Sequence, residues 1–562
     1  MAYLKTKALF FTTSPRSPIK MIPEIRLLSE EFSGREWNNE SQIDFYNRLT
    51  DSDFFERAGS AKDKAFAARD RINRAPKALG FVDLTPTIGL TEAGEALVYG
   101  KRPQEVFLRQ LLKFQLPSPY HVERNAIAGT FYVHPYLEIM RLIRELEYLT
   151  FDELKIFAIQ LTDYRRFDDI KAAVIAFRKT KSEHTNSYEN LIKDFIQMTV
   201  LSIYGDEIRN EDYRTRETPT VSKKEFIAKK HATLRDYADA CFRYLRYTGL
   251  VSISHSNRTI SFHSDKLPEV DYILTTVERD PIFLDNGVGF KAQLFSASEP
   301  MLYCDIQENI TDTIMRISDY TKRQLDGRTL DELKDLRDEI VQKHRDAVIG
   351  EQVEEIRSYS LYSEIIDTYN EIVSGGLFDA PLMLEYNTWR AMTMLNGGEI
   401  KGNLKFDDAG QPLSTAAGNM PDIECDYGDF ALSVEVTLQS GQRQYEAEGE
   451  PVARHYGQLK QRTGKETYCL FIAPNLNPAA IMHFYALNQI ENFYYGGKTQ
   501  IIPLDLSQFI NLVDAAYNHP SRPNPQDVRN FLDSTIEQVE LAVNESDWSN
   551  QIQTCVDAWL GS

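Results

Sequence analysis

Two carboxylates in the last third of the chain have the spacing of a metal-binding pair. Asp422 begins a short predicted strand (422–427), and Glu435 lies thirteen residues later in a strand predicted over 430–438. Because side chains alternate along a strand, Glu435 and Thr437 face away from the apolar stripe of that strand. A hairpin of the two strands would place the two carboxylates next to each other.

Converging carboxylates repel each other, and a divalent cation such as Mg²⁺ relieves that repulsion. A hard cation held by two carboxylates keeps positions open for a water molecule and a phosphate oxygen. It activates the attacking water and stabilises the charge that develops on the phosphate. The pair of acids therefore predicts a site for phosphodiester hydrolysis.

Three further side chains fit such a site. Glu385 lies on a helix predicted over 381–396. Glu448 is placed at the start of the next predicted helix (450–461), where the helix dipole tolerates an anion. His455 follows seven residues later on roughly the same helical face, from which it could position or deprotonate a water molecule.

Each of these side chains also has a plainer interpretation. Glu448 could serve as a helix cap, and His455 could be a hydrogen-bonded structural histidine. Glu424 and Asp426 share the strand face of Asp422, and we expect them to be solvated rather than metal ligands.

The elements that must position these residues alternate between strand and helix, which is typical of an α/β domain. A nearly continuous apolar strand is predicted over 468–473, and a further strand over 500–504. We assign this domain to residues 356–562. A charged helical linker precedes it over 301–355, in which Thr329 and Glu332 form a predicted capping box.

The first 300 residues contain two segments that resemble winged helix-turn-helix units. In the first (1–130), a helix predicted over 61–78 closes at Gly80 and is followed by two short strands and a helix start. In the second (131–300), a helix over 234–247 stops at Gly249 and is followed by a hairpin. Helices over 137–149 and 151–161, the latter capped by Thr150 and Glu153, precede that hairpin.

Basic side chains gather in both segments and are candidates for contacts with DNA phosphates and base edges. A run of charges is more often only a solvated face. The candidates are Arg69, Arg71, Arg74 and Lys77 in the first segment, and Arg214, Arg216, Lys223 and Lys224 in the second.

Composition sets limits on the kind of protein. With 562 residues, of which 42% are hydrophobic and 26% charged, the chain is typical of a globular protein with three to five domains. No apolar run is long enough for a membrane helix, no secretory signal is evident, and the five scattered cysteines lack metal-ligand spacing. We therefore expect a cytoplasmic protein with reduced thiols.

The net charge of −20 is unevenly distributed. Residues 1–300 contain 43 Lys and Arg against 42 Asp and Glu, whereas residues 301–562 contain 20 against 41. A polyanion could therefore dock on basic faces of the first half, while the second half would repel it unless tethered and neutralised by cations.

Longer strings around these residues are more specific than the isolated acids. They are Leu384-Glu-Tyr-Asn-Thr-Trp-Arg390, Pro421-Asp-Ile-Glu424, Val434-Glu-Val-Thr437, Glu448-Gly449, Arg454-His-Tyr-Gly457, Leu470-Phe-Ile-Ala-Pro474, Ala68-Arg-Asp-Arg-Ile-Asn-Arg-Ala-Pro-Lys-Ala-Leu-Gly80 and Leu111-Leu-Lys-Phe-Gln-Leu-Pro-Ser-Pro-Tyr-His121. The chain resembles the AlwI-type family of type IIS restriction endonucleases over most of its length, especially the MlyI and PleI branch with its related nicking enzymes.

This resemblance implies a multidomain α+β protein. Mainly helical winged-helix recognition domains would precede a helical linker and an α/β nuclease domain of the PD-(D/E)xK, FokI-like kind. It implies Mg²⁺-dependent cleavage of double-stranded DNA a few base pairs outside a short asymmetric site, GAGTC in this branch. Catalytic roles would fall to Glu385, Asp422, Glu435 and Glu448 with His455 as a helper, and the metal would bind Asp422, Glu435 and Glu385.

One departure from the wider fold is Thr437, which stands where most such nucleases have a lysine and cannot supply a cation. The branch shares this substitution, so the identity of the general base stays open. A single site of this kind cuts one strand, and a transient homodimer or a second subunit would be needed for the other. The alternatives are a strand-specific nicking enzyme and a catalytically silent DNA-binding protein, which Thr437 favours.

Overall fold

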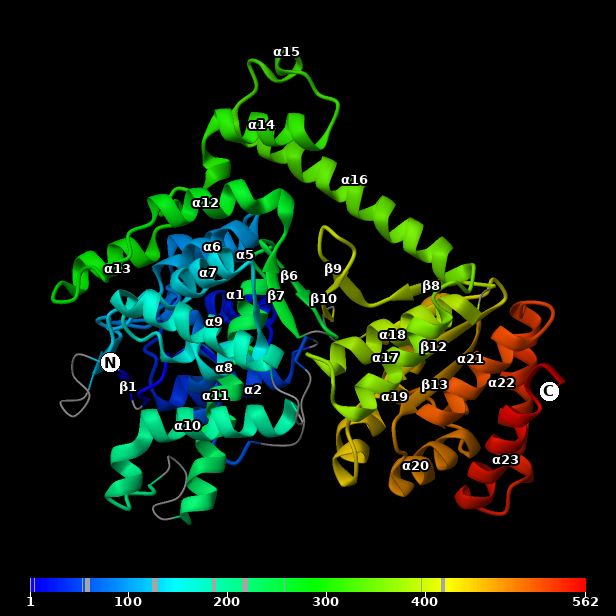
Figure 1. The fold of residues 1–562 in the computed structure, drawn as a ribbon. Coiled ribbons are helices and arrows are strands. Elements are labelled where there is room, and N and C mark those ends of the chain that lie inside the picture. Colours follow the sequence, from blue (N-terminus) through cyan, green and yellow to red (C-terminus); the bar gives the residue numbers. More distant parts are fainter. Residues whose placement is uncertain are drawn as a thin grey trace. The chain divides into compact units, whose positions relative to one another are not determined.

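The computed structural model describes residues 2–4, 6–52, 54–55, 61–123, 130–183, 188–214, 221–256, 258–395, 397–415 and 420–561. The chain forms two compact units (Figure 1). The N-terminal unit comprises Met1–Leu49 and Asp63–Ile340, and the C-terminal unit comprises Thr50–Lys62 and Val341–Ser562. The two units are described separately.

The first part of the N-terminal unit is helical apart from two short strand pairs. Its elements are β1 (Ala2–Leu4), α1 (Met21–Phe32), α2 (Asn39–Thr50), α3 (Lys64–Ile72), α4 (Ala75–Ala78), β2 (Val82–Asp83), β3 (Gly89–Leu90), α5 (Glu92–Tyr99), α6 (Pro103–Lys113) and β4 (His121–Glu123). Strands β2 and β3 form the predicted hairpin, and Thr91 caps α5 by accepting from the Gly94 N–H. The turn at Gly80 is also confirmed, since its φ is +77° and an added Cβ would lie 2.5 Å from Leu294 Cγ.

The single helix predicted over 61–78 is wrong, because the chain forms α3 and α4 with a break at Asn73 and Arg74. Pro76 accounts for the break. A proline has no N–H to donate to the carbonyl of residue 72, so the hydrogen bonding of α3 cannot continue through it, whereas the first turn of a new helix accepts a proline.

The second part contains a three-stranded sheet in the order β5-β7-β6. Its elements are α7 (Pro135–Leu146), β5 (Tyr148–Thr150), α8 (Phe151–Ile156), α9 (Phe167–Glu183), α10 (Tyr188–Arg209), α11 (Lys223–Arg246), β6 (Val251–Ser254), β7 (Thr259–Phe262), α12 (Leu267–Thr276) and α13 (Gly287–Phe295). The predicted hairpin is confirmed as β6 and β7, with Ile253 opposite Ile260. The predicted capping box of Thr150 and Glu153 is also present.

The predicted helix over 137–149 is wrong at its end. Helix α7 stops at Leu146, and residues 148–150 form β5, which pairs with β7. Residues 148–150 form a strand because β7, more than a hundred residues later, completes their hydrogen bonds. The local sequence pattern cannot indicate a partner that distant.

A run of helices connects the two units along the chain: α14 (Gln307–Ile317), α15 (Lys322–Leu325) and α16 (Leu330–Arg357). The predicted capping box before α16 is present. The Thr329 N–H donates to Glu332 Oε2 over 2.7 Å, and the Glu332 N–H donates to Thr329 Oγ1 over 3.3 Å.

The C-terminal unit is built on a five-stranded sheet in the order β14-β13-β12-β11-β8. Its elements are α17 (Tyr362–Ser374), α18 (Ala380–Leu395), β8 (Glu399–Gly402), β9 (Leu404–Phe406), β10 (Pro412–Thr415), β11 (Ile423–Asp426), β12 (Phe430–Val436), α19 (Gln442–Thr463), β13 (Glu466–Ala473), α20 (Pro478–Gln489), β14 (Ile501–Asp505), α21 (Leu506–Asn518), α22 (Pro525–Leu541) and α23 (Glu545–Asp557). Strands β12, β13 and β14 are parallel, whereas β11 is antiparallel to both of its neighbours.

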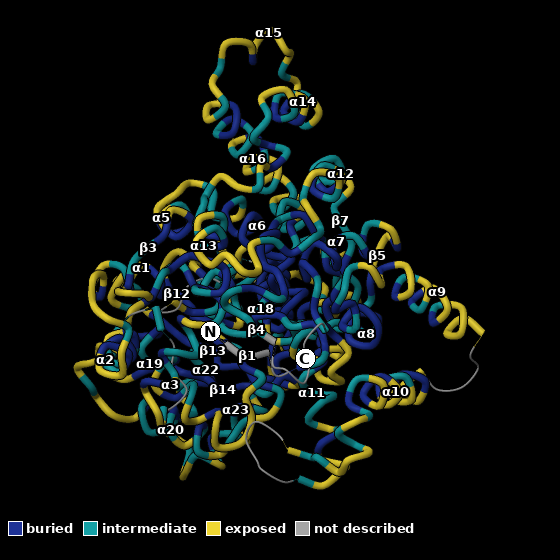
Figure 2. Tube along the Cα trace, turned by 90° about the vertical axis from the view of Figure 1, so that its left-hand side faces the viewer, coloured by how far each residue is buried: buried dark blue, intermediate teal, exposed yellow. Residues whose placement is uncertain are grey.

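Both faces of the central strand β12 are covered, and every residue from Phe430 to Glu435 is buried (Figure 2). Phe430, Leu432 and Val434 belong to one hydrophobic core, together with residues of α17, α18, α21 and α22. On the other face, α19 and α20 pack against β13 in a second core. The predicted alternation along this strand is therefore confirmed, and it leaves Glu435 on the α19 side.

Candidate active site

Asp422 and Glu435 are brought together by the antiparallel pairing of β11 and β12. Ile423 lies opposite Val434 in the ladder, so Asp422 stands opposite Glu435 at the next position. The Val436 N–H donates to Asp422 Oδ2 over 2.8 Å and fixes that carboxylate against the end of β12. Asn403 N–H donates to the Asp422 carbonyl over 2.8 Å, which anchors the backbone from the other side.

The environment of Asp422 is both buried and crowded with negative charge. Burial raises the pKa of Asp422 well above its ordinary value, and the charges of Glu435 and Glu448 raise it further. The Val436 N–H and His455 act in the opposite direction but do not outweigh these effects. Burial and negative charge thus outweigh the positive charge of His455 around this carboxylate.

Helix α19 supplies two side chains to this group. His455 Nδ1 lies 2.8 Å from Glu435 Oε1, and both side chains are less than a tenth exposed. One residue past β12, Thr437 Oγ1 donates to Glu448 Oε1 over 2.7 Å. The helix therefore presents Glu448 and His455 towards the same strand end.

The predicted position of Glu448 at the start of a helix is wrong. Helix α19 begins at Gln442 and runs through Pro451, so Glu448 lies in its second turn. A proline is favoured in the first turn of a helix, so Pro451 indicated a start near residue 450 although α19 begins eight residues earlier, at Gln442. Neither a capping role nor the helix dipole accounts for Glu448, whereas its contact with Thr437 does.

Glu385 lies half-buried on α18, a helix that packs against β12. Its neighbours in the sequence have structural roles. Asn387 Nδ2 donates to the Ile365 carbonyl over 2.9 Å, Arg390 forms an ion pair with Glu364, and Trp389 is part of the core. The role of Glu385 as a ligand stays a prediction.

Glu424 and Asp426 point to the same face of β11 as Asp422 but are engaged elsewhere. Glu424 forms an ion pair with Arg462 of α19, and Asp426 pairs with Lys465 over 2.6 Å. Each of these two carboxylates is thus paired with a cationic side chain of the protein.

Asp422, Glu435 and Glu448 carry carboxylate oxygens, the ligands that Mg²⁺ prefers, so the chemistry of these side chains suits a hard divalent cation. Their role as metal ligands stays a prediction. A bound cation would offset the repulsion that raises the pKa of Asp422.

A family model of the AlwI restriction endonucleases matches residues 77–512, a stretch that contains all of these acidic residues. The chain belongs to the AlwI restriction endonuclease family. Membership implies nuclease activity on DNA. No curated protein sequence matches the chain.

Two solved structures of restriction endonucleases are similar to this AlwI-family chain. One is the small subunit (R.BspD6I2) of the heterodimeric restriction endonuclease R.BspD6I, with 26% identity over 34% of this chain and 98% of that subunit, and a TM-score of 0.30. The other is FokI, with 10% identity over 94% of this chain and 99% of FokI, and a TM-score of 0.24.

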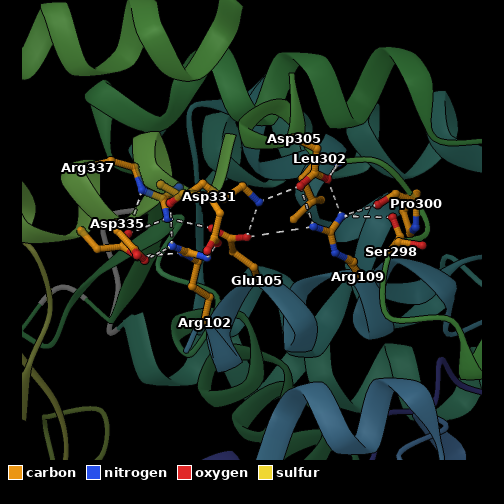
Figure 3. Close-up of polar contacts among 12 residues, drawn as sticks. Arg102, Glu105, Arg109, Ser298, Pro300, Leu302, Asp305, Asp331, Asp335 and Arg337 are labelled. Atoms are coloured by element: carbon orange, nitrogen blue, oxygen red, sulfur yellow. Dashed lines mark hydrogen bonds and ion pairs between the residues drawn. The ribbon is translucent and has the colours of Figure 1, made fainter. Parts of the chain in front are cut away.

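The N-terminal unit of this AlwI-family chain contains a second acidic group, at which Glu105, Cys304 and Asp305 bring ligand atoms within 4.8 Å of one another. Figure 3 shows Glu105 and Asp305 with the cationic side chains around them. Lys334 Nζ donates to Glu105 over 2.9 Å and to Asp305 over 2.7 Å, and Arg109 binds Asp305 through both nitrogens of its guanidinium fork. Because cationic side chains already neutralise both carboxylates, we interpret this group as an ion-pair network rather than a metal centre.

The first cluster of basic residues makes contacts within the N-terminal unit. Arg69 donates to Gln42 over 2.6 Å, and Arg71 forms an ion pair with the buried Glu24. A further ion pair joins Arg74 to Asp70, and the Lys77 ammonium lies 5.2 Å from the centre of the Tyr120 ring. These side chains therefore stabilise the fold, and DNA contacts by them stay predictions.

The second cluster is more exposed. Lys223 and Lys224 occupy the exposed first turn of α11, which Ser222 caps. Arg214 pairs with Asp212 at the surface, and Arg216 lies outside the described residues. Contacts of Lys223 and Lys224 with DNA phosphates stay predictions.

Within the described residues, none of the helices combines the length and the apolar character that crossing a membrane requires. All five cysteines are free, and four of them are buried.

Proposed function

We propose that this protein is a Mg²⁺-dependent type IIS restriction endonuclease that binds a short asymmetric site in double-stranded DNA and cleaves a few base pairs outside it. One observation supports this above the others. Asp422 and Glu435 stand opposite each other at the end of β12, and burial together with the charge of Glu435 raises the pKa of Asp422. By resemblance, the site is of the GAGTC type.

The metal would be held by Asp422 and Glu435, with Glu385 as a further ligand and Glu448 beside them. When bound, such an ion supplies Lewis-acid activation of water and charge stabilisation at the phosphate. An ionised Glu435 accepts the hydrogen bond from His455, so the proton sits on Nδ1 and the lone pair on Nε2. His455 would thus orient Glu435 and accept a proton at Nε2.

DNA recognition would lie in two winged-helix domains over 1–130 and 131–300, with the helical linker over 301–355 and the PD-(D/E)xK nuclease domain over 356–562. Helices α7, α8 and α11 together with the sheet order β5-β7-β6 support a winged helix in the second domain, into which α9 and α10 are inserted between α8 and α11. The exposed Lys223 and Lys224 on α11 support contact with the DNA backbone there.

The decisive experiment incubates supercoiled plasmid with the protein in Mg²⁺ or in EDTA, and compares Glu435→Ala with the wild type. We expect metal-dependent cleavage that Glu435→Ala abolishes, with site-specific binding retained in a gel-shift assay. Specific binding without cleavage by the wild type would instead identify a silent DNA-binding protein. Loss of binding in Glu435→Ala would refute the separation of recognition from cleavage.

A strand-specific nicking enzyme is the second candidate, because the described residues offer one set of catalytic acids at the end of β12 and one such set cuts one strand. The ratio of open-circle to linear plasmid over time separates the two candidates. A linear product that rises steeply with protein concentration would indicate that a second copy or a second subunit cuts the other strand. Run-off sequencing of both strands would give the site and the offsets.

A further inference from the structure

Thr437 occupies the position two residues after Glu435, and its hydroxyl makes two hydrogen bonds. The Gln439 N–H donates to Thr437 Oγ1 over 3.1 Å, and Thr437 Oγ1 donates to Glu448 Oε1 over 2.7 Å. The side chain is buried, at 7% exposure. A buried hydroxyl between a backbone amide and a carboxylate is oriented by both.

These two bonds determine the direction of the hydroxyl proton. A hydroxyl has a single proton, and here its oxygen already accepts from the Gln439 N–H. The proton therefore points to Glu448, whose Oε1 must act as an acceptor. A hydrogen bond to an ionised acceptor is roughly twice as strong as one between neutral groups.

The backbone fixes the hydroxyl in place. The Thr437 N–H donates to the Ile472 carbonyl of β13 over 3.1 Å, so the residue is pinned to the sheet although it lies past the end of β12. Threonine is β-branched and has few χ1 rotamers. Glu448, by contrast, has a long side chain on α19, and this hydrogen bond restricts its direction.

We propose that Thr437 is a positioning residue that holds the Glu448 carboxylate beside Asp422 and Glu435, so that the three acids together bind a divalent cation. This inference rests on the proposed function. Threonine orients the acid through its hydroxyl without adding a charge to the site. The affinity of the site for a hard divalent cation therefore depends on the Thr437 hydroxyl.

The alternative is that Thr437 only stabilises the turn into α19, through its bond with Gln439. Two substitutions test whether the hydroxyl is needed, and removal of its Glu448 partner separates the two roles. Thr437→Ser keeps both hydrogen bonds, and Thr437→Val removes both while conserving volume. Thr467→Val is the matched control, because Thr467 is fully buried at the neighbouring strand and its hydroxyl donates to the Lys465 carbonyl over 3.0 Å.

The test measures Mn²⁺ binding to the full-length protein by titration calorimetry, and DNA cleavage at saturating Mg²⁺ in parallel. We expect Thr437→Val to weaken Mn²⁺ binding by about tenfold, the effect of losing one hydrogen bond to a charged group. Thr437→Ser should stay within about threefold of the wild type, and Thr467→Val should bind as the wild type does.

A double-mutant cycle with Glu448→Ala assigns the effect to its partner, because alanine removes the oxygen that accepts the hydrogen bond. If Thr437 acts through Glu448, Thr437→Val causes no further loss in a Glu448→Ala background. Wild-type Mn²⁺ affinity in Thr437→Val, or an undiminished loss in the Glu448→Ala background, would overturn the inference. Thr437→Ala is a second hydroxyl-free variant for the same comparison if Thr437→Val lowers the melting temperature.

Failure of the proposed function would look different. In that case the wild type itself would neither bind Mn²⁺ nor cleave DNA in Mg²⁺. A wild type that binds the ion and cleaves, beside a Thr437→Val variant that does both equally well, would contradict only the role of Thr437.

Discussion

The ion-pair network between α6 and the start of α16 makes a quantitative prediction for Asp305. Its carboxylate accepts two hydrogen bonds from Arg109, at 2.7 and 2.9 Å, one from Lys334 at 2.7 Å and one from the Leu302 N–H at 2.7 Å (Figure 3). Burial alone would raise the pKa of Asp305, but these hydrogen bonds outweigh it and lower the pKa from 3.8 to about 2.

At 1.36 kcal/mol per pKa unit, this depression corresponds to about 2.4 kcal/mol of stabilisation at neutral pH. The side chain is 17% exposed, and solvent screening reduces the contribution to roughly 1–2 kcal/mol. Breaking a fully buried ion pair costs about 3–5 kcal/mol, but here Glu105 stays beside Lys334 and Arg109. We therefore expect Asp305→Asn to destabilise the N-terminal unit by about 2 kcal/mol.

The pH dependence follows from the sign of the pKa change. Because the pKa of folded Asp305 lies below that of the unfolded chain, its stabilisation is complete above about pH 5 and is lost as the pH falls towards 2. The difference in unfolding free energy between the wild type and Asp305→Asn should thus be largest near pH 7. It should fall to about half at pH 3.

Urea unfolding followed by circular dichroism at the two pH values measures this difference, and hydrogen exchange of peptides from α6 assigns it to the N-terminal unit. Asp331→Asn is the matched control. Asp331 lies in the first turn of α16 and pairs with Arg102, but its side chain is 69% exposed, so we expect no measurable change. An Asp305→Asn variant as stable as the wild type at pH 7, or a difference that grows on acidification, would refute the reasoning.

Three further predictions concern cleavage and binding. His455→Ala should slow cleavage by about 10²- to 10⁴-fold with site-specific binding unchanged, and a rate equal to the wild type would leave His455 a structural role. Glu385→Gln should weaken Mn²⁺ binding in a calorimetric titration, whereas unchanged affinity would remove Glu385 from the ligand set. Replacing Lys223 and Lys224 together by alanine should weaken binding to specific and non-specific DNA alike. In filter-binding assays it should also reduce the slope of the logarithm of the binding constant against the logarithm of the salt concentration by about 2. An unchanged slope would mean that neither lysine contacts a phosphate.

The sequence was most informative where one pattern decided the structure alone. Alternation of apolar residues from Phe430 onward predicted β12 and the face on which Glu435 lies, and the buried strand at 468–473 was correctly placed within β13. The capping box of Thr150 and Glu153 predicted the start of α8. Each of these signals comes from neighbouring residues, so distant parts of the chain were not needed.

What the sequence could not predict depends on partners far along the chain. Strand β5 exists because β7 lies beside it, and the ion pair between Arg71 and Glu24 joins residues 47 positions apart. Basic residues that were candidates for DNA contact therefore have partners within the fold. For Thr437 the sequence contained too little information. The residue type showed only that a lysine is missing, whereas the hydrogen bond to Glu448 is evident from the packing of α19 against β12.

The distribution of charge links the two activities of the chain. The half that contains the candidate active site has 41 acidic against 20 basic residues, so it repels the polyanion that it would cut. Burial and the neighbouring acids raise the pKa of Asp422, and a bound cation would relieve the repulsion among these acids. We therefore expect cleavage to require both a bound metal ion and a recognition half that is already docked on the DNA. Under these two conditions, DNA away from a specific site would be hydrolysed slowly.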